Sequence, residues 1–415
     1  MENNINFNND NEENTISSQD MIADATMPWA LDGHQIPVAD ENDHLGMIVC
    51  GIDEEDKNVE MNLEKGRKSL FALLGSAFAY KCLLPPTLQC FFWKPYTSPV
   101  ITSGLCSLPL RPTNILPLTA FHRKILQGFL KLSQSSPIPA LYFLLAELPL
   151  EARLHLDMFA LFWSIWSNPQ STMFSIAKHL LTMSVNNSRT WCIHIRHLCK
   201  KYGMTDPLVL MQEKAWSKHA WKSYTSNKVT AFHEKTLRED ASTNSKMSFL
   251  NVSLTGLNGK PHHIFEGIFS SYEVKKLRIH VKMLCQDYLT YGMLAVQSDF
   301  ILVSGHCRIF PGIWENVRHI ISECDATSNA RAISFPKIAE FLAEHESNLD
   351  WPMLKNDGLH LSQFILDPCS MNLPNHYRIP LNHPHLITLI SLLRDLCYHC
   401  HSLRSSAIKV AKLKK

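Results

Sequence analysis

The sequence predicts a mainly helical protein with a small β-hairpin near its N-terminus. Apolar residues make up 45% of its 415 residues, which is enough to bury a sizeable core. After Asn58 these residues recur every three or four positions, which is the period of a helix with one buried face. Before that point, Asp32-Gly33 lies between two short apolar segments, a pattern typical of a tight hairpin turn.

The first 57 residues divide into an acidic tail and a predicted β region. Residues 1–27 are rich in Asn, Asp and Glu and poor in aromatic residues, so we expect them to be disordered. Residues 28–57 are expected to hold the hairpin. The apolar run His44–Val49 predicts a buried strand, which the acidic run Asp53–Asp56 ends.

Residues 58–202 are expected to form a helical domain. Its first helix ends at Leu84-Pro85-Pro86, because proline cannot continue a helix. The other apolar stripes predict helices over residues 118–130, 154–165, 172–183 and 189–202.

The second half of the chain is expected to contain three further regions. Residues 203–260 are less regular and are predicted to be a basic and aromatic linker, with a short strand over Ser248–Leu254. Residues 261–335 are predicted to be a helical region that includes a helix over 272–288. Residues 336–415 form a C-terminal helical region whose last helix follows Pro384 and ends in a basic tail.

Charge is distributed very unevenly. Residues 1–64 hold 16 acids and one base, whereas the rest of the chain holds 22 acids and 39 bases. A basic body of this size favours a polyanionic partner such as RNA or DNA, although a mixed solvated surface is the alternative. No apolar run reaches the ~18 residues of a membrane span. No secretory signal precedes the 12 cysteines, so we expect free thiols in the nucleus or cytoplasm, with no membrane partner.

The segment from Trp216 to Lys228 alternates aromatic residues with lysine. This pattern suits a stacking surface for single-stranded nucleic acid, and the alternative is two tryptophans that anchor a loop. The basic stretch Lys275, Lys276 and Arg278 is a second candidate for phosphate contacts, and a solvated helix face is its alternative.

Cys307, His319 and Cys324 have the spacing of a small zinc knuckle. A structural zinc site needs four ligands, and Phe310 stands at the place of the second one. Phenylalanine cannot ligate zinc. The segment is therefore either a weakened zinc site or a metal-free element that packs through Phe310 and its apolar neighbours.

No catalytic motif is complete in this sequence. It contains no Asp-Asp pair, no GxxxxGK phosphate loop, no HExxH and no GxSxG. We therefore assign no catalytic residue and expect no cofactor other than the zinc considered above.

An ordered set of segments over residues 28–415 resembles the C-terminal part of a non-LTR (LINE-type) retrotransposon reverse transcriptase. The stretch Trp29–Gly51 is similar to the hairpin that grips the primer at the edge of the palm domain. Cys307–Cys324 resembles the C-terminal knuckle. The thumb-like likeness lies in Asn62–Gly75, Lys81–Leu84, Phe121–Leu130, Ser136–Phe143 and Glu147–Arg153.

The resemblance implies an RNA-directed DNA polymerase whose palm carboxylates hold two Mg²⁺ ions. Those carboxylates are missing here, so we expect a truncated, nucleic-acid-binding fragment that is inactive alone. Alternatives are completion by a separate palm-containing chain, a host-used interaction scaffold, or a pseudogene product without function. The candidate contacts with nucleic acid are Arg67, Lys68, Arg123, Lys124, Lys218, Lys222, Lys275, Lys276 and Arg278.

Overall fold

The computed structural model describes residues 30–31, 34–35, 41–75, 84–183, 190–268, 270–292, 305–307, 312–346 and 348–413. These residues are mainly helical, with short antiparallel hairpins before the helices, which confirms the predicted fold class. The chain divides into two compact units, Met1–Lys57 and Asn58–Lys415. The boundaries expected at residues 202, 260 and 335 therefore fall inside the second unit.

The first unit holds two small hairpins. Strand β1 (Ala30–Leu31) pairs antiparallel with β2 (His34–Gln35), and the turn predicted at Asp32-Gly33 lies outside the described residues. Strand β3 (Glu41–His44) pairs with β4 (Met47–Cys50), and the predicted buried strand over 44–49 is wrong. Leu45 and Gly46 form the turn with positive φ angles of 51° and 82°, and Leu45 is 93% exposed. A left-handed turn at Leu-Gly interrupts what reads in the sequence as one apolar run.

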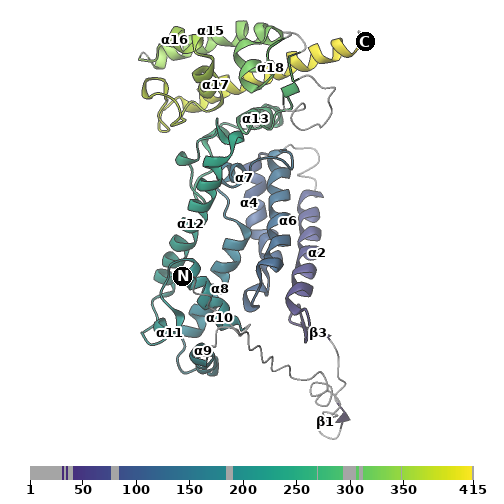
Figure 1. Ribbon diagram of the computed structural model, residues 1–415, viewed down its shortest axis with the longest axis vertical. Helices are drawn as coiled ribbons and strands as arrows, with labels where there is room; N and C mark the ends of the chain where they lie inside the picture. The colour runs from purple at the N-terminus through teal and green to yellow at the C-terminus, as the bar shows by residue number, and fades with distance from the viewer. Residues whose placement is uncertain are drawn as a thin grey trace, which may run out of the picture. The chain divides into compact units, whose positions relative to one another are not determined.

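Helix α2 (Glu54–Gly75) leads into the helical unit, where it packs beside α4 and α6 (Figure 1). The Asn62 amide donates to the carbonyl oxygens of Ile101 (3.1 Å) and Ser103 (2.7 Å), which fixes α2 against the end of α5. Proline is the first residue of α4 and α6 and the second residue of α5, positions where its missing N–H costs nothing. These elements are α4 (Pro86–Tyr96), α5 (Ser98–Thr102), η1 (Leu105–Ser107) and α6 (Pro112–Leu130).

The apolar core of this part lies where α7 and α8, which also pack on α6, meet the long helix α12. Tyr142, Phe159, Trp166 and Trp221 are all at most 2% exposed there. Helix α12 corrects the predicted linker over 203–260, because it is one of the longest helices in the structure (Figure 1). The elements are α7 (Ile138–Leu145), α8 (Leu150–Trp166), α9 (Thr172–Met183), α10 (Trp191–Lys201), α11 (Pro207–Leu210) and α12 (Lys218–Thr243).

Short turns follow α12, and the strand predicted over Ser248–Leu254 is wrong. The side chains of Asn244 and Asn251 accept hydrogen bonds from the backbone two residues ahead, which closes 3₁₀ turns instead. The turns of this region are η2 (Ser245–Met247), η3 (Val252–Leu254) and η4 (His263–Phe265).

The C-terminal helices pack around α18 (Leu386–Leu413), which contacts α13, α15 and α17 (Figure 1). It begins just after Pro384, as predicted. No helix among the described residues is long and apolar enough to cross a membrane. The remaining elements are α13 (Ser271–Leu284), η5 (His319–Glu323), η6 (Asp325–Thr327), α15 (Ser328–His345), α16 (Trp351–Asn356), α17 (Gly358–Leu366) and η7 (Asn375–Tyr377).

Candidate nucleic-acid interface and metal centre

A groove of about 880 Å³ lies between α2 and α6. Its wall is largely apolar, and among the described residues no Asp or Glu lines it. Cations from three helices surround it. They are Arg67 on α2, Lys124 and Lys131 at the end of α6, and Arg278 on α13. The groove thus gathers Arg67, Lys124 and Arg278, three of the predicted nucleic-acid contacts, which lie far apart in the sequence.

Aromatic rings share the lining of the groove with these cations. Phe71 is 71% exposed, and the Arg67 guanidinium lies 5.9 Å from the centroid of the Phe121 ring. Arg278 is half-buried, and burial lowers its pKa without removing its charge. Its Nε is buried and has no hydrogen-bond partner among the described residues. The groove therefore offers both apolar faces and partly dehydrated positive charge.

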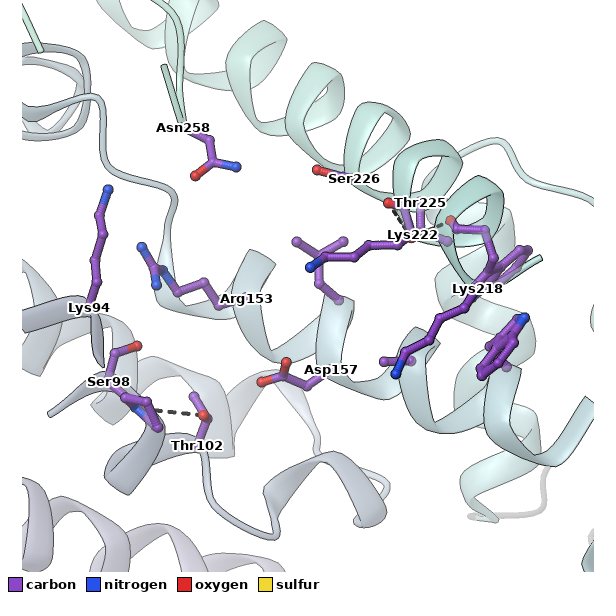
Figure 2. A pocket seen from close by; sticks show the side chains of 15 residues that line it. Lys94, Ser98, Thr102, Arg153, Asp157, Lys218, Lys222, Thr225, Ser226 and Asn258 are labelled. Atoms are coloured by element: carbon purple, nitrogen blue, oxygen red, sulfur yellow. Dashed lines mark hydrogen bonds between the residues drawn. The ribbon is translucent and has the colours of Figure 1, made fainter. Parts of the chain in front are cut away.

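A second hollow, of about 490 Å³, lies between α4, α8 and α12 (Figure 2). Lys94 and Arg153 reach into it from one side, and Lys218 and Lys222 reach in from α12 on the other. Asp157 is its only acidic lining residue among those described. Asp157 is an exposed residue. Partial burial of its carboxyl nevertheless raises its pKa.

A buried carboxylate pairs with two of the cations that line this pocket. Glu147 has no exposed side-chain surface, and it pairs with Lys94 (3.0 Å) and with Arg153. The pairing fixes the two cations in place, because an unpaired charge at this depth is strongly unfavourable. Lys218 is held differently, with its ammonium 5.9 Å from the Trp163 ring centroid.

The other predicted contact residues lie outside both hollows. Lys68 is exposed and pairs with Glu64 at 2.7 Å, and Lys275 is exposed on α13. Arg123 is half-buried, and its charge lies near the buried Tyr142 hydroxyl. Lys276 is only 8% exposed, and its Nζ lies 2.8 Å from a Glu273 oxygen and 2.5 Å from an Asp395 oxygen. Lys276 therefore has an internal role, so we leave it out of the interface proposed below.

The segment from Trp216 to Lys228 has two faces. Trp221 is 2% exposed, and its Nε1 donates to the Phe159 carbonyl oxygen at 2.8 Å, so it anchors the start of α12 in the core. Trp216 is 38% exposed and packs against Trp221. Lys218, Lys222 and Trp221 all line the second hollow, but Trp221 is too deeply buried to serve as a stacking platform.

Cys307, His319 and Cys324 come together as their spacing predicted. Their donor atoms all lie within 4.8 Å of one another, and the three side chains are at most 3% exposed. The two sulfur atoms are 3.8 Å apart. Zn–S bonds of about 2.3 Å at a tetrahedral angle require a separation of about 3.8 Å. Both ring nitrogens of His319 are buried without a hydrogen-bond partner among the described residues, so one of them is available to ligate a metal.

The fourth place of this cluster is less well defined. Residues 308–311, and with them Phe310, lie outside the described residues. His306 is exposed, and its ring packs edge-on against Trp314, away from the cluster. A Glu323 oxygen lies 3.5 Å from His319 Nδ1, where it can orient the ring or approach a metal. Burial raises the pKa of Cys324 to about 11, so a bound cation is needed to hold its thiolate.

A second group of metal-ligand type was not predicted from the sequence. His262, His263 and Asp367 are buried, with their donor atoms within 4.8 Å of one another. Asp367 accepts hydrogen bonds from His263 Nε2 (2.9 Å) and the Cys369 backbone N–H (3.2 Å). The Nδ1 of His262 accepts from the Ile264 N–H, so the neutral ring carries its proton on Nε2, facing Asp367. This group fits a hydrogen-bonded buried carboxylate better than a metal site.

The adjacent His-His pair was the only local signal for this group, since Asp367 is about a hundred residues away.

Comparison of the sequence with known protein families, with curated proteins and with solved structures finds no match.

Proposed function

We propose that this protein binds the sugar–phosphate backbone of RNA or DNA, with bases against the groove between α2 and α6. The observation that carries the proposal is the lining of that groove, which combines Arg67, Lys124, Lys131 and Arg278 with phenylalanine rings and no described acid. Cations along a groove follow phosphates, and exposed rings stack on bases without reading their sequence. The affinity is therefore weakly specific and sensitive to salt.

The proposed source of this surface is a truncated reverse transcriptase of the non-LTR retrotransposon class. The cationic groove lies on α2 and α6, which include the segments that resemble the thumb of that family. A thumb holds a primer–template without taking part in the chemistry. We accordingly propose binding without catalysis by this chain alone, with a separate palm-containing chain as the partner needed for DNA synthesis.

Salt dependence of binding tests the proposal. Fluorescence anisotropy with a single-stranded oligonucleotide of about 16 nucleotides gives the binding constant across a salt series. The triple variant Arg67→Gln, Lys124→Gln, Lys131→Gln should reduce the slope of log K against log salt by about 2, because each lost phosphate contact removes about 0.7.

A matched triple variant controls for net charge. Lys214, Lys228 and Lys337 are exposed and line neither hollow, so their replacement by Gln removes the same charge elsewhere. It should leave the slope nearly unchanged. Equal losses in the two triple variants would show that net charge, rather than the groove, drives binding.

Zinc is the metal that we propose for Cys307, His319 and Cys324. Two sulfurs at tetrahedral spacing and an unpartnered imidazole match its preferred ligands. When bound, zinc would hold both thiolates and join η5 to the segment around Cys307.

Metal analysis of the purified protein should find zinc. The Cys324→Ser variant should lose the zinc, whereas Cys106→Ser, which replaces a half-buried thiol elsewhere, should keep it. A zinc-free wild-type protein would overturn this assignment.

A further inference from the structure

The pocket between α4, α8 and α12 has the features of a small-anion site and is separate from the groove (Figure 2). Four cations converge on it from three helices, while Asp157 is the only acid in its described lining. Its volume of about 490 Å³ suits a single small ligand rather than a strand. The positive charge is concentrated within one enclosure, where it acts more strongly than on an open surface.

One side of the pocket is built for a phosphate group. Glu147 lies behind Lys94 and Arg153 and keeps both cations fixed before any ligand arrives. Lys222 extends from α12 toward them (Figure 2). A phosphate between these three side chains would accept charge-assisted hydrogen bonds from two sides, and the guanidinium can bind two of its oxygens at once.

The other side of the pocket is apolar and aromatic. Trp163 and Ala160 line it beside Lys218, and Trp163 is fixed because its Nε1 donates to the Trp216 carbonyl oxygen at 2.9 Å. A flat ring can pack there at little entropic cost. The carboxyl of Asp157 lies between the cationic and apolar sides, where it can accept hydrogen bonds from ribose hydroxyls.

We propose that this pocket binds a nucleoside monophosphate, with the phosphate at Lys94, Arg153 and Lys222 and the base toward Trp163. Such a ligand is either a free nucleotide or the phosphorylated end of a strand, and both present the same chemistry. The pocket does not depend on nucleic-acid binding at the groove, so this inference goes beyond the proposed function.

Titration of the full chain with adenosine 5′-monophosphate, followed by calorimetry, tests the proposal. The wild-type protein should bind this nucleotide more tightly than inorganic phosphate. Lys222→Gln should weaken binding about tenfold, which is the usual effect of one lost charge-assisted hydrogen bond. Lys228→Gln removes a lysine on the same helix that does not line the pocket, and it should change nothing.

Two further variants sharpen the test. Glu147→Gln removes the buried carboxylate that keeps Lys94 and Arg153 fixed, so a folded variant should bind the nucleotide more weakly than wild type. Lys124→Gln in the groove should leave nucleotide affinity unchanged, which separates this proposal from the proposed function.

The outcomes are distinguishable. An oligonucleotide with a 5′-phosphate that competes with the mononucleotide, when its 5′-hydroxyl counterpart does not, assigns the pocket to strand ends. Failure of both oligonucleotides to compete assigns it to free nucleotides. Absence of nucleotide binding at millimolar concentration, inorganic phosphate binding as tightly as the nucleotide, or equal losses in Lys222→Gln and Lys228→Gln would overturn the proposal.

Discussion

His122 shows what burial does to a single titratable side chain. It has no exposed surface, it stacks on Trp93 with ring centroids 5.4 Å apart, and neither of its nitrogens has a hydrogen-bond partner among the described residues. Burial, reinforced by the nearby charge of Arg153, lowers the pKa of His122 to about 3. Burial also lowers the pKa of His280 to about 3, although its Nε2 donates to the Leu366 carbonyl oxygen at 2.9 Å. Both rings are therefore neutral in the folded protein.

These neutral histidines make stability depend on pH. In the unfolded chain these histidines have a pKa of about 6.5, so they bind protons below that pH, whereas in the folded chain they stay neutral down to about pH 3. The free energy of unfolding therefore decreases as pH falls from 6.5 toward about 3. Between about pH 7.5 and about pH 5.5 each histidine should contribute a loss of about 1.4 kcal/mol. Urea unfolding at the two pH values measures it.

The variant His122→Phe retains an aromatic ring beside Trp93 but cannot titrate. Its stability should fall less between the two pH values than that of wild type, whereas His219→Gln, at an exposed position, should behave like wild type. An unchanged pH dependence in His122→Phe would mean that this ring is protonated in the folded state.

At the scale of elements, the contact between α2 and α5 depends on one glycine. A Cβ on Gly66 would overlap Ile101 Cγ1 and lie 2.9 Å from its Cδ1. Ile101 has no exposed surface and cannot move aside freely. Gly128 in α6 is the natural comparison, because a Cβ there would meet nothing within 4 Å.

Two alanine substitutions should therefore have opposite effects. Gly66→Ala should destabilise the protein by about 1–3 kcal/mol through overpacking, and Gly128→Ala should stabilise it by about 0.5–1 kcal/mol through helix propensity. Thermal unfolding followed by circular dichroism measures both. Stabilisation by both substitutions would show that α2 and α5 are not in close contact.

The sequence predicted helices where an apolar stripe was continuous, as in α6, α8 and α9. It missed α12 because the buried face of that helix alternates apolar with polar residues: Thr225 and His233 lie between Trp221, Val229 and Leu237. The cluster of Cys307, His319 and Cys324 could be predicted from local spacing, since its members lie within 18 residues. The pocket did not, because its cations come from three helices and only the packing of the chain brings them together.

At the scale of the whole molecule, the dominant feature is charge asymmetry. Residues 1–64 carry a net charge of −15, and the remainder carries +17. The acids of residues 1–26 number six with no base, so we expect them to oppose the proposed attraction of the chain for a polyanion. This opposition acts through space and weakens as salt shortens the Debye length.

Deletion of residues 1–26 should strengthen oligonucleotide binding at low salt and have little effect at high salt. A full-length chain whose six acids are replaced by their amides should match the deletion, because both remove the same charge. Affinity that is unchanged or lower in both proteins at low salt would contradict an electrostatic role for this segment.

Cross-linking tests the central claim, binding of nucleic acid at the groove, most directly. Ultraviolet irradiation of the protein with single-stranded RNA, followed by mass spectrometry, identifies the residues that contact bases. We predict cross-links in the peptides that contain Phe71 and Phe121, and their loss in the Arg67, Lys124 and Lys131 triple variant. Cross-links confined to peptides of α15–α18, with none at the groove, would contradict the account.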